Sequence, residues 1–186
     1  MTAIPASSRN TPLTADAPLP ARRPAEHAPV SSEDYRGAIS RLPTGITVIT
    51  APGPDGPAGC TANAVLSLSL EPPSLLVSLA TGSRTLAAVL AAGTFGVNVL
   101  TWADRALAGQ FATGPGDSRF RGVPWRPVRG VPVLDRTAVS AVCRIHQTVG
   151  LLDHTLVAGT VTWTRTGATG ATVLYRHRQH ALEDER

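Results

Sequence analysis

The sequence has no lysine, only two cysteines and no long apolar run. All 17 basic residues are arginines, and they are scattered rather than gathered into the basic stripe that nucleic-acid binding requires. No apolar segment approaches the roughly 18–20 residues of a membrane helix. Cys60 and Cys143 show no metal-site spacing, so we expect free thiols, with Cys143 a buried apolar residue. We therefore expect no nucleic-acid, membrane or metal partner, and a cytoplasmic protein because the N-terminus lacks an apolar signal core.

The usual catalytic motifs are also missing. The chain has no G-x-S-x-G, no H-E-x-x-H, no P-loop and no close pair of carboxylates in an apolar setting. No G-x-G-x-x-G opens a helix, which argues against a Rossmann fold. If the protein is an enzyme, a cofactor rather than its side chains carries the chemistry.

A chain of 186 residues fits one domain of ordinary size. Residues 1–30 are rich in Pro, Ala, Ser and Thr without periodicity, which predicts a disordered tail. We expect the folded domain to span residues 31–180, followed by a short C-terminal tail at 181–186.

Apolar alternation predicts six or seven antiparallel strands and three short helices. Strands are expected at 45–51, 58–70, 74–80 and 94–100, within 137–150 and 154–164, and at 171–177. Helices are expected after the N-caps Ser31, Ser83 and Thr101, with Gly93 ending the second. Residues 114–135 read as a long Gly/Pro-rich loop of the kind that is usually functional or lies at an interface. The pattern is typical of a mainly β protein built as a small barrel.

Three short stretches carry candidate chemistry, each with a structural alternative. Ser83, Arg84 and Thr85 begin a helix, where N–H groups and a guanidinium bind phosphate; plain helix capping is the alternative. The small residues of "TANA" (61–64) would let a flat ring approach the backbone, or would allow close strand packing. His154 in "DHT" is either functional or a surface turn residue.

Taken in order, longer segments resemble one family. "RLPTGITVIT", "CTANAVLSLSLEPPSLLVSLATGSRTLAAVLAAGTFGVNVL", "LAGQFA", "RFRGVPWRPVRGVPVLD" and "LLDHTLVAGTV" together resemble the short-chain flavin reductases, which are the reductase components of two-component flavin-dependent monooxygenases. The resemblance spans about residues 33–177. It implies a homodimeric FMN-binding split barrel of Greek-key type that binds FMN or FAD near the dimer interface. It also implies that NADH or NADPH reduces the flavin, which then diffuses to a partner monooxygenase.

The resemblance also assigns residues. It places Pro43, Thr44 and Gly45 beside the flavin, and Thr61, Ala62, Asn63 and Ala64 along the ring and ribityl chain, with Cys60 adjoining. It makes Ser83, Arg84 and Thr85 the phosphate-binding turn and places the aromatic ring of Phe120 near the flavin or the partner subunit. It places Asp153, Tyr175 and Arg178 toward the nicotinamide, with His154 as the catalytic residue there.

The chain departs from the family pattern at three places. Leu152 precedes "DH" where the family often has Gly, "YRHRQ" with His177 and Gln179 replaces a Y-R-G-R-Y type segment, and Val65 stands where an aromatic is common. Two other functions remain open: a flavoprotein that keeps FMN tightly bound and acts on its own substrate, and a non-catalytic flavin- or haem-binding protein. The choices between FMN and FAD, and between NADH and NADPH, stay open as well.

Overall fold

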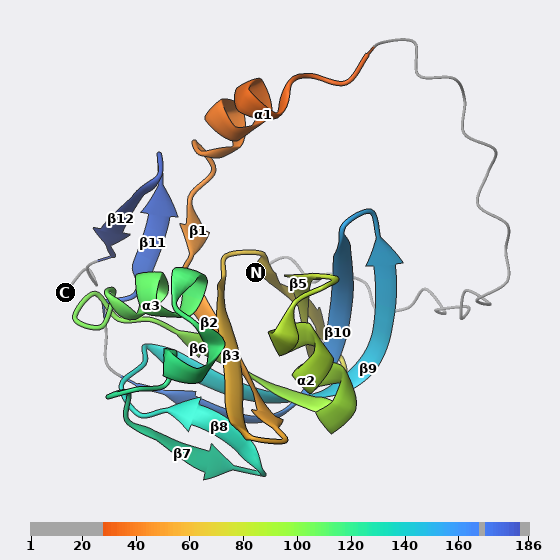
Figure 1. Cartoon of the computed structure of the whole chain (residues 1–186), viewed down its shortest axis with the longest axis vertical. Helices are drawn as coiled ribbons and strands as arrows, with labels where there is room; N and C mark the ends of the chain where they lie inside the picture. Colours follow the sequence, from red (N-terminus) through yellow and green to blue (C-terminus); the bar gives the residue numbers. More distant parts are fainter. Residues whose placement is uncertain (1–27, 168–169, 183–186) are drawn as a thin grey trace, which may run out of the picture.

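The computed structural model describes residues 28–167 and 170–182, and most of these residues form β-strands (Figure 1). The tails expected at 1–30 and 181–186 fall largely on residues outside these ranges. The elements are α1 (Ser32–Ile39), β1 (Thr44–Gly45), β2 (Thr47–Gly53), β3 (Gly56–Ala62), β4 (Val65–Leu70), β5 (Pro73–Ala80), α2 (Arg84–Ala92), β6 (Thr94–Val99), α3 (Leu107–Thr113), η1 (Gly116–Ser118), β7 (Trp125–Val128), β8 (Val131–Leu134), β9 (Val139–Leu151), β10 (His154–Thr166), β11 (Thr172–Tyr175) and β12 (Arg178–Ala181).

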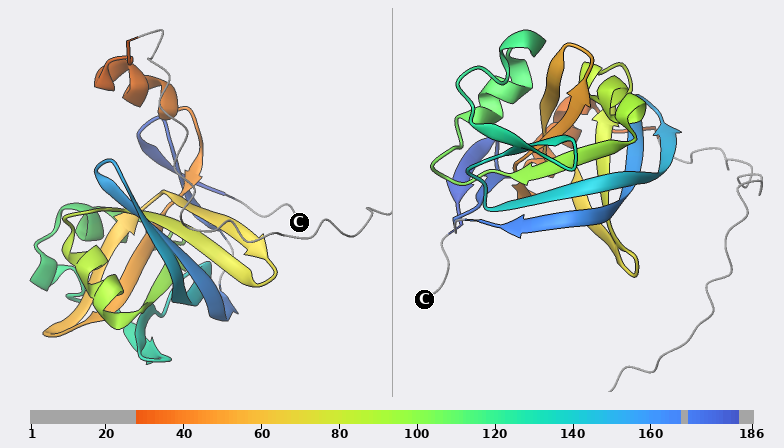
Figure 2. Two further views of the ribbon diagram at one scale, coloured as in Figure 1. Left: turned by 90° about the vertical axis from the view of Figure 1, so that its right-hand side faces the viewer. Right: turned by 90° about the horizontal axis from the view of Figure 1, so that it is seen from below.

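One curved antiparallel sheet of seven strands organises the domain. Its order is β3-β2-β6-β9-β10-β5-β4, and two smaller sheets, β1-β11-β12 and β7-β8, adjoin it. Figure 2 shows the large sheet curling around the core while α2 and α3 lie against its β2–β3 end. The expected mainly β fold with few helices is confirmed, although β3 and β4 at the two ends of the sheet are not hydrogen-bonded neighbours.

The strand expected at 58–70 is two strands, and this part of the prediction was wrong. Ala62 lies opposite Thr47 on β2, whereas Val65 lies opposite Val77 on β5. The chain therefore crosses from one end of the sheet to the other at Asn63. Residues 60–64 are all small and contain neither Pro nor Gly, so the sequence carries no turn signal that would reveal the change of partner.

Three further expectations needed correction. The last strand, expected at 171–177, ends at Tyr175 and is followed by a turn and β12, so the described residues form twelve strands instead of the expected six or seven. The segment 114–135 is not one continuous loop, because it contains η1 and the β7–β8 hairpin. The third helix begins at Leu107 rather than next to Thr101. The Thr101 hydroxyl still accepts a hydrogen bond from the Asp104 amide, at 3.2 Å, but it caps only a turn that precedes the helix.

The other predicted caps are confirmed. The Ser31 hydroxyl accepts from the Asp34 amide at the start of α1, and the Ser83 hydroxyl accepts from the Leu86 amide at the start of α2. Gly93 ends α2 with a positive φ of 67°, a left-handed conformation that glycine adopts without steric cost. Among the described residues, none of the helices has the length and apolarity needed to cross a membrane.

The main core lies between α2 and the inner face of the large sheet. Phe95 is fully buried there and packs over Gly159, where a Cβ atom would lie 2.6 Å from the ring. Burial raises the pKa of the Cys143 thiol to about 12, so it stays protonated. Cys143 is thus the buried, unreactive residue that the sequence predicted.

Asn98 joins three strands through buried hydrogen bonds. Its Nδ2 donates to the Val48 carbonyl at 3.0 Å and to the Thr50 hydroxyl at 3.2 Å, while its Oδ1 accepts from the Leu134 amide at 3.0 Å. The side chain is fully buried on β6. It therefore fastens the β7–β8 hairpin to the large sheet.

We expect Asn98→Ala to lower the free energy of unfolding by about 2–3 kcal/mol, because buried backbone groups lose their partners. Urea denaturation measures the change. Asn63→Ala is the matched control at an exposed position and should shift stability by less than about 0.5 kcal/mol. Equal stability of the two variants would show that the Asn98 hydrogen bonds contribute little.

Candidate active site

A cleft of about 820 Å³ opens between α2, the β2–β3 hairpin and the segment that follows α3. Residues 53–59 of the hairpin form one wall, α2 forms a second, and Gly116, Arg119 and Phe120 contribute the third. Two arginines, Arg84 and Arg119, line it. The cleft therefore combines small residues with positive charge.

The first turn of α2 lies in this cleft, as the phosphate-site hypothesis requires. Ser83, Arg84 and Thr85 all line it. The first N–H groups of a helix lack intrahelical acceptors, and the helix dipole adds positive potential there. The Ser83 hydroxyl satisfies one of these groups, the Leu86 amide. Capping and anion binding are therefore compatible here rather than alternatives.

The Arg84 guanidinium lies against Gly116 on the opposite wall. A Cβ atom at Gly116 would collide with the guanidinium nitrogen atoms. Glycine at this position thus lets the Arg84 side chain reach across the mouth of the cleft. The sequence indicated Arg84 but gave no sign of the role of Gly116.

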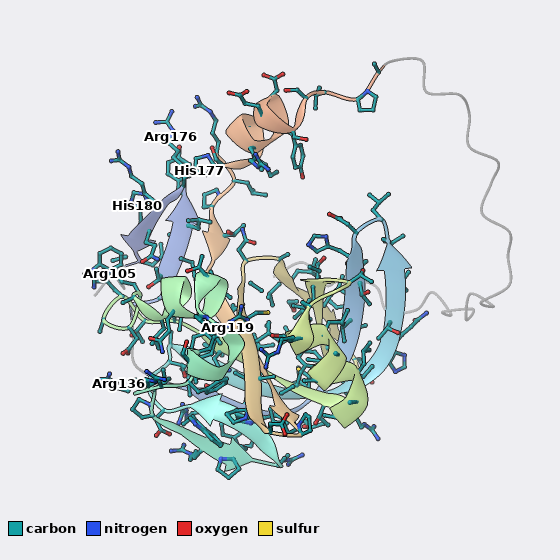
Figure 3. The ribbon with its side chains drawn as sticks, viewed as in Figure 1. Arg105, Arg119, Arg136, Arg176, His177 and His180 are labelled. Atoms are coloured by element: carbon teal, nitrogen blue, oxygen red, sulfur yellow. The ribbon has the colours of Figure 1, made fainter. Side chains whose placement is uncertain are left out.

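Arg119 is a site residue that the sequence analysis missed. Its Nε donates to the Gly114 carbonyl at 2.9 Å and its Nη1 to the Gly59 carbonyl at 2.8 Å. Figure 3 shows this side chain beside β3, near the centre of the fold. The available signal was its place directly before Phe120 in a Gly/Pro-rich segment. A guanidinium has five N–H donors, so Arg119 can bind an anion while it keeps both bonds.

Cys60 belongs to β3 and connects this strand to the first turn of α2 through a hydrogen bond with Thr85. Burial raises the pKa of the Cys60 thiol, while a hydrogen bond with Thr85 and the charge of Arg119 act in the opposite direction. The thiol is therefore protonated at neutral pH. Cys60 does not line the cleft itself, so its predicted contact with a flavin ring stays a prediction.

Phe120 lines the cleft and also packs into the protein. Its ring meets Phe111 edge-on at 4.9 Å and Trp125 at 6.1 Å between centroids. These contacts hold the segment after η1 against α3. The aromatic ring predicted near a ligand is thus also an anchor for one wall of the cleft.

The "TANA" residues 61–64 end β3 and form the crossing to β4. The Thr61 hydroxyl donates to the Ala108 carbonyl of α3 at 2.6 Å, and the Thr47 hydroxyl donates to the Ala62 carbonyl at 2.6 Å. Asn63 and Ala64 are exposed. The small side chains therefore serve close packing at the first two positions and leave an open surface at the last two.

Asp153 and His154 form an exposed pair at the β9–β10 turn. His154 Nδ1 lies 2.8 Å from Asp153 Oδ1, and this hydrogen bond holds the pKa of the Asp153 carboxyl below its usual range. His154 lies opposite Ala80 on β5, and the Asp153 carbonyl accepts from the Thr81 amide. The sheet register thus places this pair next to the turn that leads into α2.

Two departures from the family pattern occupy left-handed backbone. Leu152 has a φ of 55° and is 98% exposed, and His177 has a φ of 62° in the β11–β12 turn. Non-glycine residues are disfavoured there because Cβ crowds the backbone. Glycine, which the resembled pattern has at both positions, would adopt this conformation without that cost.

Of the predicted site residues, only Ser83, Arg84, Thr85 and Phe120 line the cleft. Five others lie on or next to the small sheet. Thr44 and Gly45 form β1, which pairs with β11 at Leu174 and Val173. Pro43 directly precedes β1, while Tyr175 and Arg178 flank the β11–β12 turn and face each other across it. None of these five residues lines the cleft. Their predicted roles beside the flavin and the nicotinamide stay predictions.

The sequence is similar to those of known flavin reductases. The family model of the flavin reductase like domain matches residues 39–182. A flavin reductase (NADH) of Kitasatospora aureofaciens is 42% identical over 150 residues, covering 77% of this chain and 78% of the relative. The FMN reductase (NADH) RutF of Stutzerimonas stutzeri is 41% identical over 132 residues, covering 70% and 76%.

A solved structure shows the same fold. The styrene monooxygenase flavin reductase of Pseudomonas putida S12 superposes with a TM-score of 0.74 at 27% identity, over 82% of this chain and 99% of its own. The family model covers most of the chain, from the last residue of α1 to the residue after β12, and this part includes every strand of the described fold. This chain belongs to the family of the flavin reductase like domain.

Proposed function

We propose that this protein is an NADH-dependent flavin reductase that releases reduced flavin to a partner monooxygenase. The observation that carries the proposal is the cleft, where a helix N-terminus and two arginines face a wall of small residues. The names of its relatives, two of them NADH-dependent reductases and one a monooxygenase component, support the reaction and the partner. The free thiols Cys60 and Cys143 suit the reducing cytoplasm that we propose as its location.

The residues of the cleft fit a flavin phosphate. Amide groups at the start of α2 and the Arg84 guanidinium provide donors for phosphate oxygens. Arg119 adds a second positive charge, held in place by its bonds to Gly59 and Gly114. The exposed crossing at Asn63 and Ala64 offers a surface for a flat ring.

When bound, the flavin supplies the two-electron chemistry by accepting hydride from the nicotinamide. The protein's own task is then to hold both molecules at the right distance and orientation. His154, oriented by its hydrogen bond with Asp153, is proposed to position the nicotinamide. This division of labour accounts for the missing acid–base motifs. NADPH remains an alternative co-substrate.

NADH oxidation that depends on added FMN or FAD, followed at 340 nm, tests the proposal. We expect Arg84→Ala to raise the flavin KM by about 10- to 100-fold, because a charged hydrogen bond to phosphate contributes about 1.5–3 kcal/mol. Arg144→Ala on β9 is the control, since Arg144 is exposed and does not line the cleft.

No flavin-dependent NADH oxidation by the wild type would overturn the proposed function. An unchanged flavin KM in Arg84→Ala would instead show that Arg84 has a structural role at the start of α2 and does not bind the flavin phosphate. Gel filtration after turnover distinguishes released flavin from the tightly bound cofactor of the alternative flavoprotein.

The role of His154 predicts a different kinetic effect. In His154→Ala, we expect the rate of flavin reduction by NADH to fall about tenfold, with flavin affinity unchanged, because orientation of the nicotinamide is lost. Stopped-flow absorbance measures the rate and calorimetry the affinity. His146→Ala, another exposed histidine on β9, serves as control. A matching loss of flavin affinity would show that His154 contacts the flavin and does not position the nicotinamide.

An exposed apolar face supports the homodimer that we propose. On the outer face of the large sheet, Leu66 on β4 lies opposite Leu76 on β5, and Leu156 on β10 lies opposite Val149 on β9. Leu70 at the end of β4 is 88% exposed. Contiguous apolar surface of this kind marks protein interfaces. The His154 turn borders this face, so a second subunit would complete the nicotinamide side of the site.

We expect Leu66→Asp to convert the dimer to monomer, because a charge on the apolar face cannot be buried unpaired. Light scattering after size-exclusion chromatography measures the mass. Leu90→Asp on α2 is the matched control, since Leu90 is 48% exposed and Leu66 51%. A wild-type monomer, or equal behaviour of both variants, would refute this interface.

A further inference from the structure

One wall of the cleft belongs to a segment with little regular structure. Between the end of α3 at Thr113 and the start of β7 at Trp125, the described residues form turns and the short helix η1. Arg119 and Phe120, which line the cleft, lie in this segment. Each residue that is held in one conformation loses entropy, so a segment of this kind needs contacts from its neighbours to stay ordered.

Gln110 on α3 provides such contacts. Its Nε2 donates to the Arg119 carbonyl at 2.8 Å and to the Arg121 carbonyl at 3.1 Å, and it lies 3.5 Å from the Ser118 carbonyl. A side-chain amide nitrogen carries two hydrogen atoms, so the two shorter bonds use both. Gln110 is half-buried and does not line the cleft. One side chain of α3 therefore holds the backbone on both sides of Phe120.

These contacts require a hydrogen-bond donor of this length. A glutamate has the same shape as glutamine, but its ionised carboxylate only accepts hydrogen bonds and would place oxygen against the carbonyl oxygens. The backbone of Gln110 contributes as well, because its carbonyl accepts from the Gly114 amide at 3.1 Å. Gln110 thus contacts the segment at its beginning and at the part that carries Arg119.

Arg119 is held at both of its ends. Its carbonyl accepts from Gln110, while its guanidinium donates to the Gly114 and Gly59 carbonyls. Loss of the Gln110 contact would leave the guanidinium to hold the residue in place as well as to bind an anion. With Gln110 present, the N–H groups that remain on the guanidinium are available to a ligand in a fixed position.

We propose that Gln110 is a positioning residue of the flavin site, whose side-chain amide holds Arg119 at the wall of the cleft. It acts on the flavin through Arg119 and does not touch the flavin itself. The proposal rests on the proposed flavin reductase function, because it takes the anion at Arg119 to be the flavin phosphate.

Flavin-dependent NADH oxidation by Gln110→Met tests this proposal. Methionine keeps the length and the helix preference of glutamine but has no N–H donor. We expect the flavin KM to rise about fivefold, as for the loss of ordinary hydrogen bonds, with kcat unchanged. Thr113→Val is the matched control, since the Thr113 hydroxyl donates to the Gly109 carbonyl within the same helix and does not line the cleft. The control should keep the wild-type KM.

A double-mutant cycle with Arg119→Met separates positioning from a general structural role. If Gln110 acts through Arg119, then Gln110→Met should raise the flavin KM by less than about twofold in a chain that already carries Arg119→Met. The full effect of Gln110→Met in that chain would overturn the proposal. An unchanged KM in Gln110→Met alone would also overturn it.

Hydrogen–deuterium exchange without flavin gives a second measurement that does not depend on activity. In Gln110→Met, the amides of residues 118–123 should exchange at least about tenfold faster than in the wild type, while those of α2 keep their rate. Unchanged exchange at 118–123, or faster exchange throughout the domain, would refute a local positioning role. Faster exchange confined to 118–123, in a protein that oxidises no NADH with added flavin, would support this role and overturn the reductase function.

Discussion

The cleft depends on one side chain, because Arg119 ties two of its walls together. Its guanidinium joins the Gly114 carbonyl after α3 to the Gly59 carbonyl in β3. Gly59 also lets α3 pack closely on β3, because a Cβ atom there would lie 3.0 Å from the Phe111 ring of α3. The end of α3, strand β3 and the segment that carries Arg119 therefore meet at this side chain. The positively charged guanidinium that joins them also lines the cleft. Structural and binding roles are thus combined in one residue.

Contacts with β3 and with the β9–β10 turn of the large sheet fix the position of α2. Thr85 in the first turn of α2 is buried and hydrogen-bonded with Cys60 of β3. In the turn before α2, the Thr81 amide donates a hydrogen bond to the Asp153 carbonyl at the β9–β10 turn. The turn that leads into α2, proposed to bind phosphate, and the Asp153–His154 pair are therefore neighbours. A shift of the β9–β10 turn would therefore also move the residues that lead into α2. This arrangement gives the two proposed substrate sites a common rigid support.

Helix α1 and the residues that link it to β1 pack less closely than the rest of the described domain. Helix α1 has no buried residue, and Tyr35, Ile39 and Leu42 around it are exposed. The small sheet β1-β11-β12 carries Thr44 and Gly45, which the family resemblance places beside the flavin, and Tyr175 and Arg178, which it places toward the nicotinamide. None of these residues lines the cleft. Exposed apolar residues on α1 and on the outer face of the large sheet both suit contact with a second subunit. The proposed dimer would therefore complete the site as well as cover apolar surface.

The sequence by itself determined the local elements and the family. Ser31, Ser83 and Gly93 set helix ends through interactions within a few residues, so their roles followed from residue type and spacing. The order of the motifs was enough to recognise the flavin reductase resemblance. Tertiary structure alone decided that residues 58–70 form two strands, that Arg119 reaches Gly59 sixty positions away, and that the cleft extends to Asp55. These features depend on contacts between segments that are far apart in the sequence. Apolar periodicity and capping residues indicate only local structure, so they do not predict such contacts.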